Sequence, residues 1–233
     1  MIGQIKRRII DLLNRNKSNE EIFSKIYKNN YWGGEEGFYS GEGTYVQDSE
    51  LYINAVIDFI KVNNIRSVVE IGCGDFHVAN LIVEETNVDY TGFDVVPDLV
   101  SHLNEKFGKP NIRFICGDAS SKEVQFPHAD LCIIRQVLQH LNNDSIHNIL
   151  QNTSHISKLI VTEHIPLKPE LINADKPTNG YIRLQNKQIS GVYLDRPPFN
   201  KIVKQELLRI RLDDKNYDGE LIPAELVTQF IEN

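Results

Sequence analysis

The sequence has 233 residues, of which 41% are hydrophobic and 24% charged. A chain of this length and composition buries a sizeable core without disulfides or metals, which excludes small stapled folds and disordered proteins. Its formal net charge of -7 repels polyanions, so we expect no nucleic acid partner. We expect a single domain over residues 1–233.

The three cysteines lie in or beside apolar, strand-like runs and have no C-x-x-C spacing. This usage indicates a reducing compartment, and we expect a cytoplasmic protein. The N-terminal residues 1–15 lack the uninterrupted apolar stretch of a signal peptide. No apolar run reaches the roughly 18 residues of a transmembrane helix, so we expect no membrane span.

Two short helices are predicted before residue 31. Apolar residues at helical spacing predict the first over residues 2–14, and Ser18 followed by Glu21 is a capping box that begins the second. Packing on the fold is favoured for the first helix over a membrane surface, because Asp11 interrupts its basic side.

Residues 31–45 are rich in glycine and aromatic residues. Such a segment is either a loop whose rings pack on the core or a flap that covers a ligand, and both interpretations remain open. In the flap interpretation, Tyr39 and Gly41 are candidate cofactor contacts.

From residue 51 onward, helical and strand-like segments alternate. A helix is expected over Leu51–Lys61, and the strand-like runs have apolar helical material between them. This alternation predicts a doubly wound α/β fold with a parallel sheet. The expected strands are Ser67–Ile71, Tyr90–Val95, Ile112–Cys116, Leu131–Arg135 and Leu159–Thr162.

Prolines and glycines punctuate the chain after Pro166. We expect a loop-rich cap with a final helix over Glu220–Glu232, which would complete the sheet and wall the active site. Short strands are expected at Gly180–Leu184, Ile189–Leu194 and Leu207–Leu212. The expected organisation is N-terminal helices and flap over 1–50, a cofactor-binding core over 51–165, and an acceptor-side cap over 166–233.

The stretch Ser67–Asp75 reads as a strand, a tight turn with Gly72 and Gly74, and the start of a helix. Such turns bring backbone N–H groups close to a ligand. A dinucleotide site would need a third glycine where His77 stands, and Glu70 would repel a pyrophosphate. A cationic ligand suits this turn better.

Two further carboxylates follow the next predicted strands. Asp94 stands where a carboxylate can accept from ribose hydroxyls, and Asp118 can accept from the amine of adenine. The combined demand is for a positively charged adenosine without phosphate, and S-adenosylmethionine fits it.

Four segments in this order resemble the successive motifs of class I S-adenosylmethionine-dependent methyltransferases: Val68–Gly74, Gly92–Asp94, Cys116–Ala119 and Arg135–Leu141. The resemblance covers about residues 50–165. It implies a seven-stranded, mostly parallel sheet, with S-adenosylmethionine as cofactor and S-adenosylhomocysteine as product. The cofactor-binding residues that it implies, together with their neighbours, are Glu70, Gly72, Cys73, Gly74, Phe76, Asp94, Val95, Asp118, Ala119, Arg135 and Gln136.

One departure is Phe76, which stands where many members of this family have a third glycine. Its ring packs either over the cofactor or away from it. A softer resemblance links the chain to small bacterial methyltransferases, some of them associated with capsular or other surface-glycan modification. It rests on Ser40–Thr44, Cys73–Phe76, Val137–Leu141, Asn173–Asp175, Gly180–Arg183 and Pro197–Phe199.

Methyl transfer needs alignment and, for an alcohol acceptor, a proton acceptor. His140, His164 and Gln136 follow predicted strands and are the candidate catalytic residues. Some related enzymes bind a metal through E-x-x-E-H. Here the two acids are Gln136 and Gln139, so we expect no metal. Arg183 is a candidate for phosphate or carboxylate binding, with a solvated surface arginine as the alternative.

The sequence therefore predicts an O-methyltransferase for a small polar acceptor, such as a sugar or a phosphorylated or phosphoramidate sugar-linked group in surface polysaccharide biosynthesis. The alternatives are methylation of another small metabolite, a nicotinamide-dependent oxidoreductase, and a non-catalytic module that binds the cofactor. The oligomeric state stays open, with a homodimer as one candidate.

Overall fold

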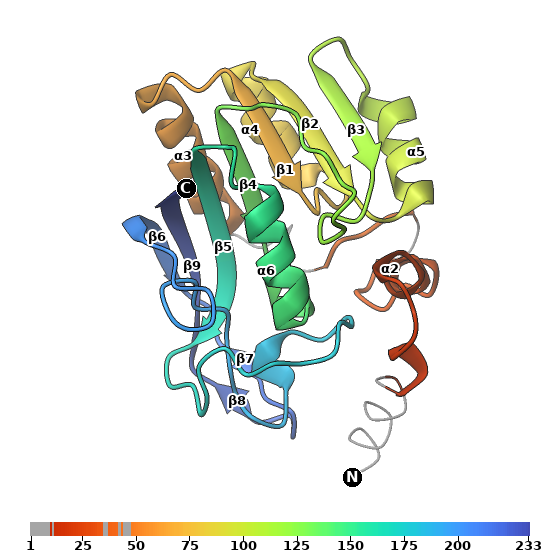
Figure 1. Cartoon of the computed structure of the whole chain (residues 1–233), viewed down its shortest axis with the longest axis vertical. Helices are drawn as coiled ribbons and strands as arrows, with labels where there is room; N and C mark the ends of the chain where they lie inside the picture. Colours follow the sequence, from red (N-terminus) through yellow and green to blue (C-terminus); the bar gives the residue numbers. More distant parts are fainter. Residues whose placement is uncertain (1–9, 11, 35–36, 42, 44–47) are drawn as a thin grey trace.

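The computed structural model describes residues 10, 12–34, 37–41, 43 and 48–233. One seven-stranded sheet in the order β3-β2-β1-β4-β5-β9-β6 forms its centre. In Figure 1, helix α6 lies in front of this sheet and α4 behind it, and α2 lies beyond the ends of β1, β2 and β3. The helices are α2 (Asn19–Lys28), α3 (Asp48–Val62), α4 (His77–Thr86), α5 (Pro97–Phe107) and α6 (Asn143–Asn152), with short 3-10 turns η2 (Leu138–His140) and η3 (Arg183–Gln185).

The first five strands are parallel, and β9 runs antiparallel to both of its neighbours, β5 and β6. The predicted doubly wound, seven-stranded, mostly parallel sheet is confirmed. The strands are β1 (Ser67–Ile71), β2 (Asp89–Asp94), β3 (Ile112–Cys116), β4 (Leu131–Arg135), β5 (Lys158–Pro166), β6 (Val203–Arg211) and β9 (Ala224–Glu232). A separate two-stranded sheet joins β7 (Asp214–Lys215) to β8 (Leu221–Ile222).

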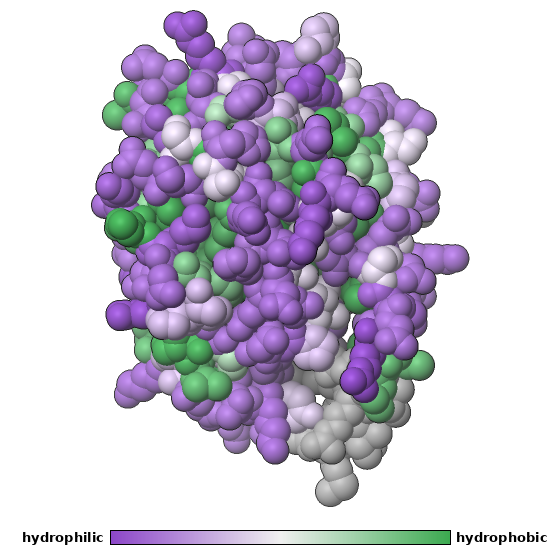
Figure 2. All heavy atoms as spheres, viewed as in Figure 1, coloured by the Kyte–Doolittle hydropathy of each residue, from purple (hydrophilic) through white to green (hydrophobic). Residues whose placement is uncertain are grey.

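The central strands are buried on both faces. Strand β4 is the run Leu-Cys-Ile-Ile-Arg, of which the first four residues are buried, and the last four residues of β1 are buried as well. Helices on either side cover such strands, which is why their sequences are continuous apolar runs. The face of the molecule seen in Figure 2 is mostly hydrophilic, with small separate apolar patches.

The second N-terminal helix is present as α2, and its capping box is formed. Ser18 accepts from the backbone N–H of Glu21, and the Glu21 carboxylate accepts from the backbone N–H of Ser18. The helix expected over 2–14 falls largely outside the described residues. Within this range, residues 10 and 12–14 are described, and they are helical. No helix in the described ranges is long and apolar enough to span a membrane.

The final helix expected over Glu220–Glu232 is wrong. This stretch forms β8 and then β9, which pairs with β5 along its whole length from Ala224 opposite Pro166 to Glu232 opposite Lys158. Its apolar residues fit a helix by spacing alone. Pairing with β5 on one edge and β6 on the other supplies this segment with backbone hydrogen bonds from both sides, so tertiary context overrides the local pattern.

Two of the three short strands expected in the cap are also wrong. Gly180–Leu184 leads into the turn η3, and Ile189–Leu194 has no strand pairing within the sheets. Hydrogen bonds from side chains hold this region instead: Asn173 donates to the carbonyls of Tyr193 and Pro197. The third prediction, Leu207–Leu212, overlaps β6.

Candidate functional site

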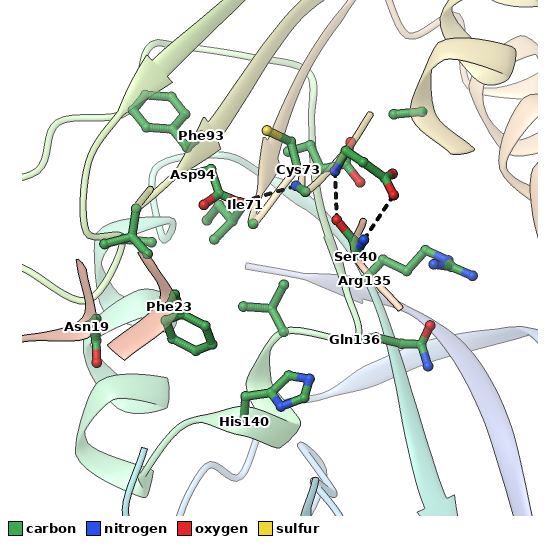
Figure 3. A pocket seen from close by; sticks show the side chains of 18 of the residues that line it. Asn19, Phe23, Ser40, Ile71, Cys73, Phe93, Asp94, Arg135, Gln136 and His140 are labelled. Atoms are coloured by element: carbon green, nitrogen blue, oxygen red, sulfur yellow. Dashed lines mark hydrogen bonds between the residues drawn. The ribbon is translucent and has the colours of Figure 1, made fainter. Parts of the chain in front are cut away.

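A cavity lies at the carboxyl ends of β1, β2 and β4, between the strand ends and helix α2 (Figure 3). Its empty volume, including the open mouth, is about 1030 Å³, which is sufficient for a small ligand. Ligands of open α/β sheets bind at this edge. Of the candidate site residues, those that line the cavity are Glu70, Gly72, Cys73, Gly74, Asp94, Val95, Asp118, Ala119, Arg135, Gln136 and His140.

The glycine turn is built so that only glycine fits. Gly72 and Gly74 have φ values of 66° and 54°, a left-handed conformation that disfavours other residues. A Cβ on Gly72 would lie 2.5 Å from a methyl group of Val137, and one on Gly74 would lie 2.5 Å from Ser40 Oγ. Both positions therefore require glycine, and both glycines line the cavity.

Glu70, the last but one residue of β1, is buried beneath the turn. Its carboxylate accepts a hydrogen bond of 2.5 Å from the hydroxyl of Tyr90. Burial raises the pKa of Glu70 to about 7, against the lowering effects of Tyr90 and of the charge on Arg135. A cation bound nearby would favour the ionised form.

Asp94, at the end of β2, accepts from the backbone N–H groups of Gly74 at 3.2 Å and Val96 at 3.1 Å. Burial raises its pKa to about 6 although both hydrogen bonds lower it. The carboxylate therefore ties the end of β2 to the glycine turn and still faces the cavity.

Asp118 and Ala119 follow β3. One Asp118 oxygen accepts from the backbone N–H and the hydroxyl of Ser120, at 2.9 and 2.7 Å. The other accepts from the side-chain amide of Asn19 at 3.0 Å. Asn152 of α6 supports this loop from behind by donating to the carbonyl of Ala119.

Helix α2 forms a wall of the cavity that the sequence had not pointed to. Asn19, Phe23 and Tyr27 line the cavity at a spacing of four residues, which places them on one helical face. Trp32 lies beside them, with ring centroids 5.4 Å from Tyr27 and 5.4 Å from His140. In the sequence, the four-residue spacing of Asn19, Phe23 and Tyr27 after the capping box could have indicated that one face of this helix lines the site.

The glycine-aromatic segment touches the turn through Ser40. Ser40 Oγ accepts from the backbone N–H of Asp75 at 2.7 Å, and the backbone N–H of Ser40 donates to the Asp75 carboxylate at 3.0 Å. The hydroxyl of Tyr27 lies 2.8 Å from Ser40 Oγ. Tyr39 and Gly41 are not among the lining residues, and parts of the segment lie outside the described residues.

The assignment of Phe76 to the cofactor is wrong for its side chain. The ring is 1% exposed and packs against Tyr90, Phe107 and Phe114, with centroid distances of 5.0, 5.3 and 4.9 Å. Phe76 has a φ of 63° in place of the expected third glycine, and the ring turns into the core behind the turn.

Arg135 and Gln136 end β4 at the cavity. The Arg135 guanidinium stacks over the ring of Tyr52 at 4.9 Å and donates to the carbonyl of Gly43, while its buried Nε has no partner. Burial lowers the pKa of Arg135. Gln136 has a φ of 55°, which is uncommon for a residue other than glycine and marks a constrained position.

His140 points into the cavity from η2, as Figure 3 shows. Its ring contacts Phe23 and Trp32, and its buried Nδ1 has no hydrogen-bond partner. Burial and the charge of Lys176 lower the pKa of His140 to about 3. The imidazole is therefore neutral and can accept a hydrogen bond from a bound ligand.

His164 does not reach the cavity, so its catalytic assignment is wrong. Its Nε2 lies 2.6 Å from the carbonyl of Leu212, and its Nδ1 lies 3.6 Å from the Asp214 carboxylate. Burial lowers the pKa of His164 despite these acceptors. The residue fixes β5 to the segment after β6.

Arg183 is also structural. It is fully buried and donates to the carbonyls of Ala174 and Leu141 and to the side chain of Asn143. This binds the cap to the loop that carries His140. Within the described ranges, no group of three or more His, Cys, Asp or Glu side chains could hold a metal ion.

Comparison with known proteins agrees with this geometry. A family model described as a methyltransferase domain matches residues 68–158. TehB from Haemophilus influenzae shares the fold, with a TM-score of 0.54 and 16% identity over 77% of this chain and 62% of that one. The chain thus spans less than two thirds of TehB. No curated relative matches the sequence.

Two further solved structures have the same fold. The methyltransferase domain of bacterial CtHen1-CN gives a TM-score of 0.51 and 12% identity, over 78% of this chain and 97% of that one. The N-methyltransferase NodS from Bradyrhizobium japonicum, solved in complex with S-adenosyl-L-homocysteine, gives 0.51 and 12% over 79% and 87%. The matched model is that of a methyltransferase domain, and the three solved structures share the fold of this chain.

Proposed function

We propose that the protein transfers a methyl group from S-adenosylmethionine, bound in the strand-end cavity, to a small polar acceptor. The observation that carries the proposal is the set of acids at the ends of β1, β2 and β3 around a bare glycine turn. Glu70 suits the ammonium group of the methionine part, Asp94 the ribose hydroxyls and Asp118 the adenine amine. A pyrophosphate would meet these three carboxylates unfavourably.

The residues present fit this donor. Gly72 and Gly74 pack so closely against Val137 and Ser40 that a Cβ at either position would collide with them. The wall formed by Phe23, Tyr27 and Trp32 is aromatic, and aromatic faces attract a cation such as a sulfonium. When bound, the donor supplies an electrophilic methyl group whose bonding electrons return to sulfur.

The protein's own contribution is alignment and an acceptor for a proton. We propose that His140 Nδ1 accepts a hydrogen bond from the attacking hydroxyl and directs its oxygen at the methyl carbon. Because burial lowers its pKa to about 3, His140 takes up the proton only as the new C–O bond forms, after which the proton leaves to water. Gln136 would orient the remainder of the acceptor.

The finer part of the proposal concerns the acceptor. We propose O-methylation of a sugar, or of a phosphorylated or phosphoramidate sugar-linked group, in surface polysaccharide biosynthesis in the cytoplasm. Its support is the sequence resemblance of the segments around Ser40, Gln139 and Asn173 to small bacterial methyltransferases, some of them associated with surface-glycan modification. The neutral hydrogen-bonding groups of Gln136 and His140 at the cavity add to it. The free cysteines fit a reducing compartment.

Isothermal titration with S-adenosylhomocysteine and with NADH tests the donor. We expect binding of the first in the micromolar range or tighter and no binding of the second. Tight NADH binding without S-adenosylhomocysteine binding would establish the oxidoreductase alternative. A panel of sugars, sugar phosphates and amines with labelled S-adenosylmethionine then tests the acceptor, and incorporation into amines alone would contradict O-methylation.

A further inference from the structure

Asn19 is fixed beside Asp118 by a closed set of hydrogen bonds. The Asn19 amide nitrogen donates to Asp118 Oδ2 at 3.0 Å and to Ser120 Oγ at 3.1 Å. Ser120 in turn donates its hydroxyl and its backbone N–H to Asp118 Oδ1. Both hydrogens of the Asn19 amide are used, so the orientation of its carboxamide is set.

Acceptor capacity is left over in this set. Asn19 Oδ1 accepts from no described residue, and Asp118 Oδ2 has one of its two lone pairs engaged. The oxygen and nitrogen of an amide are about 2.3 Å apart. Together with the 3.0 Å hydrogen bond, this places the two free acceptors within about 5.3 Å of each other.

A primary amine matches such a pair. An –NH₂ group that donates two hydrogen bonds of about 2.9 Å bridges acceptors about 5 Å apart. Both Asn19 and Asp118 line the cavity, and neither free acceptor can pair with a carbonyl oxygen. A 6-oxo purine would bring its oxygen against two other oxygens.

From this geometry we infer that Asn19 is a specificity-determining residue that, with Asp118, reads the 6-amino group of the donor's adenine and rejects a 6-oxo purine. The inference rests on the proposed function, because it needs adenine at this end of the cavity. It assigns a donor contact to a residue outside the matched span 68–158.

Helix α2, which carries Asn19, is held in place by contacts at its start and near its end. Its start is closed by the Ser18–Glu21 capping box. At its other end, Tyr27 meets Ser40 at 2.8 Å, and Trp32 donates to the carbonyl of Gly180 at 3.2 Å. A carboxamide held from both ends of its helix loses little freedom when a ligand binds, which favours selectivity.

The test is calorimetric binding of S-adenosylhomocysteine and of S-inosylhomocysteine, its 6-oxo counterpart, to the full chain. For the unchanged protein we expect at least about tenfold weaker binding of the inosine compound, because two acceptors are left facing an oxygen. In Asn19→Ala, we expect affinity for S-adenosylhomocysteine to fall about tenfold and affinity for S-inosylhomocysteine to change less than about threefold.

A control variant separates loss of base recognition from a general disturbance of helix α2. Glu20→Ala changes the exposed neighbour on α2 and should leave both affinities unchanged. If Asn19→Ala lowers both affinities by the same factor, or if the unchanged protein binds both ligands equally, Asn19 does not read the base and the inference is wrong. If neither ligand binds the unchanged protein, the proposed function itself fails.

Discussion

The cavity and the cap both contain buried polar side chains, but the two regions differ in how many hydrogen-bond partners these side chains have. Glu163, near the cap, uses both carboxylate oxygens to accept from the backbone N–H groups of Leu138 and Gln139. Glu70, at the cavity, has one hydrogen bond from a side chain. Nε2 of His164 has the carbonyl of Leu212 as its partner, whereas Nδ1 of His140 has no partner. In these two pairs of residues, spare hydrogen-bonding capacity and not burial separates the cavity from the cap, although Arg183 Nε in the cap also has no partner.

The largest expected effect is in the cap. Arg183→Met removes a fully buried guanidinium from three acceptors and should lower the free energy of unfolding by about 3–5 kcal/mol. Urea denaturation measures this. An unchanged unfolding midpoint would mean that the cap does not depend on its buried hydrogen bonds. The contrast drawn between the cap and the cavity would then be wrong.

Next is the glycine turn. Gly72→Ala forces a side chain onto a φ of 66° and into Val137, which should weaken S-adenosylhomocysteine binding at least about tenfold, since strain of this kind costs about 1–3 kcal/mol. Gly219→Ala is the matched control: its φ is 88°, and nothing lies within 4 Å of the added Cβ. Loss of binding in the control would show that strain anywhere in the fold, and not the turn, controls the site.

The pH dependence of Glu70 sharpens the comparison further. Its pKa of about 7 in the fold lies above the usual value of about 4.3, so the folded protein binds the proton more tightly than the unfolded chain. This contribution to stability is full below about pH 4 and is lost as the pH rises through 7.

Ligand binding should show the opposite trend, because the ammonium group of the donor favours the carboxylate. We expect S-adenosylhomocysteine to bind about tenfold more tightly at pH 8 than at pH 6. Glu70→Gln should flatten both profiles. A pH-independent affinity in the unchanged protein would place the ammonium group elsewhere.

The smallest effects distinguish the two histidines. His164→Gln should lower the free energy of unfolding by about 1 kcal/mol, the typical net value of a hydrogen bond, with S-adenosylhomocysteine affinity unchanged. His140→Ala should leave stability within about 1 kcal/mol and instead slow methyl incorporation into any acceptor found by the panel. If His164→Gln were the variant that slowed methyl transfer, the structural role of His164 would be wrong.

Features that depend on residues close together in the sequence could be predicted from it. The runs through Val69 and Ile133, the Gly72 turn and the acids at strand ends predict the sheet and the edge at which a ligand binds. The strand β9 was not readable, because Leu226 and Ile231 suit a helix by spacing, and pairing with β5 decides between the two.

Packing direction was the other unreadable feature. Phe76 follows the end of β1 and His164 lies near the end of β5, just as Asp94 ends β2 and His140 follows β4, but the side chains of Phe76 and His164 turn away from the cavity. The direction depends on distant partners: Phe114 for the first and Leu212 for the second. The contribution of α2 depends likewise on Asn19 meeting Asp118, which is 99 residues away along the chain.

The sheet order has a consequence for how the chain folds during synthesis. Strand β6 joins the sheet through β9, which follows it in the chain. A ribosome-bound chain that has released β1 to β6 therefore leaves one edge of β5 open and β6 without a neighbour. Open edges of this kind invite pairing with other chains. Both edges are closed in the folded protein by Ala224–Glu232, which lies between β5 and β6.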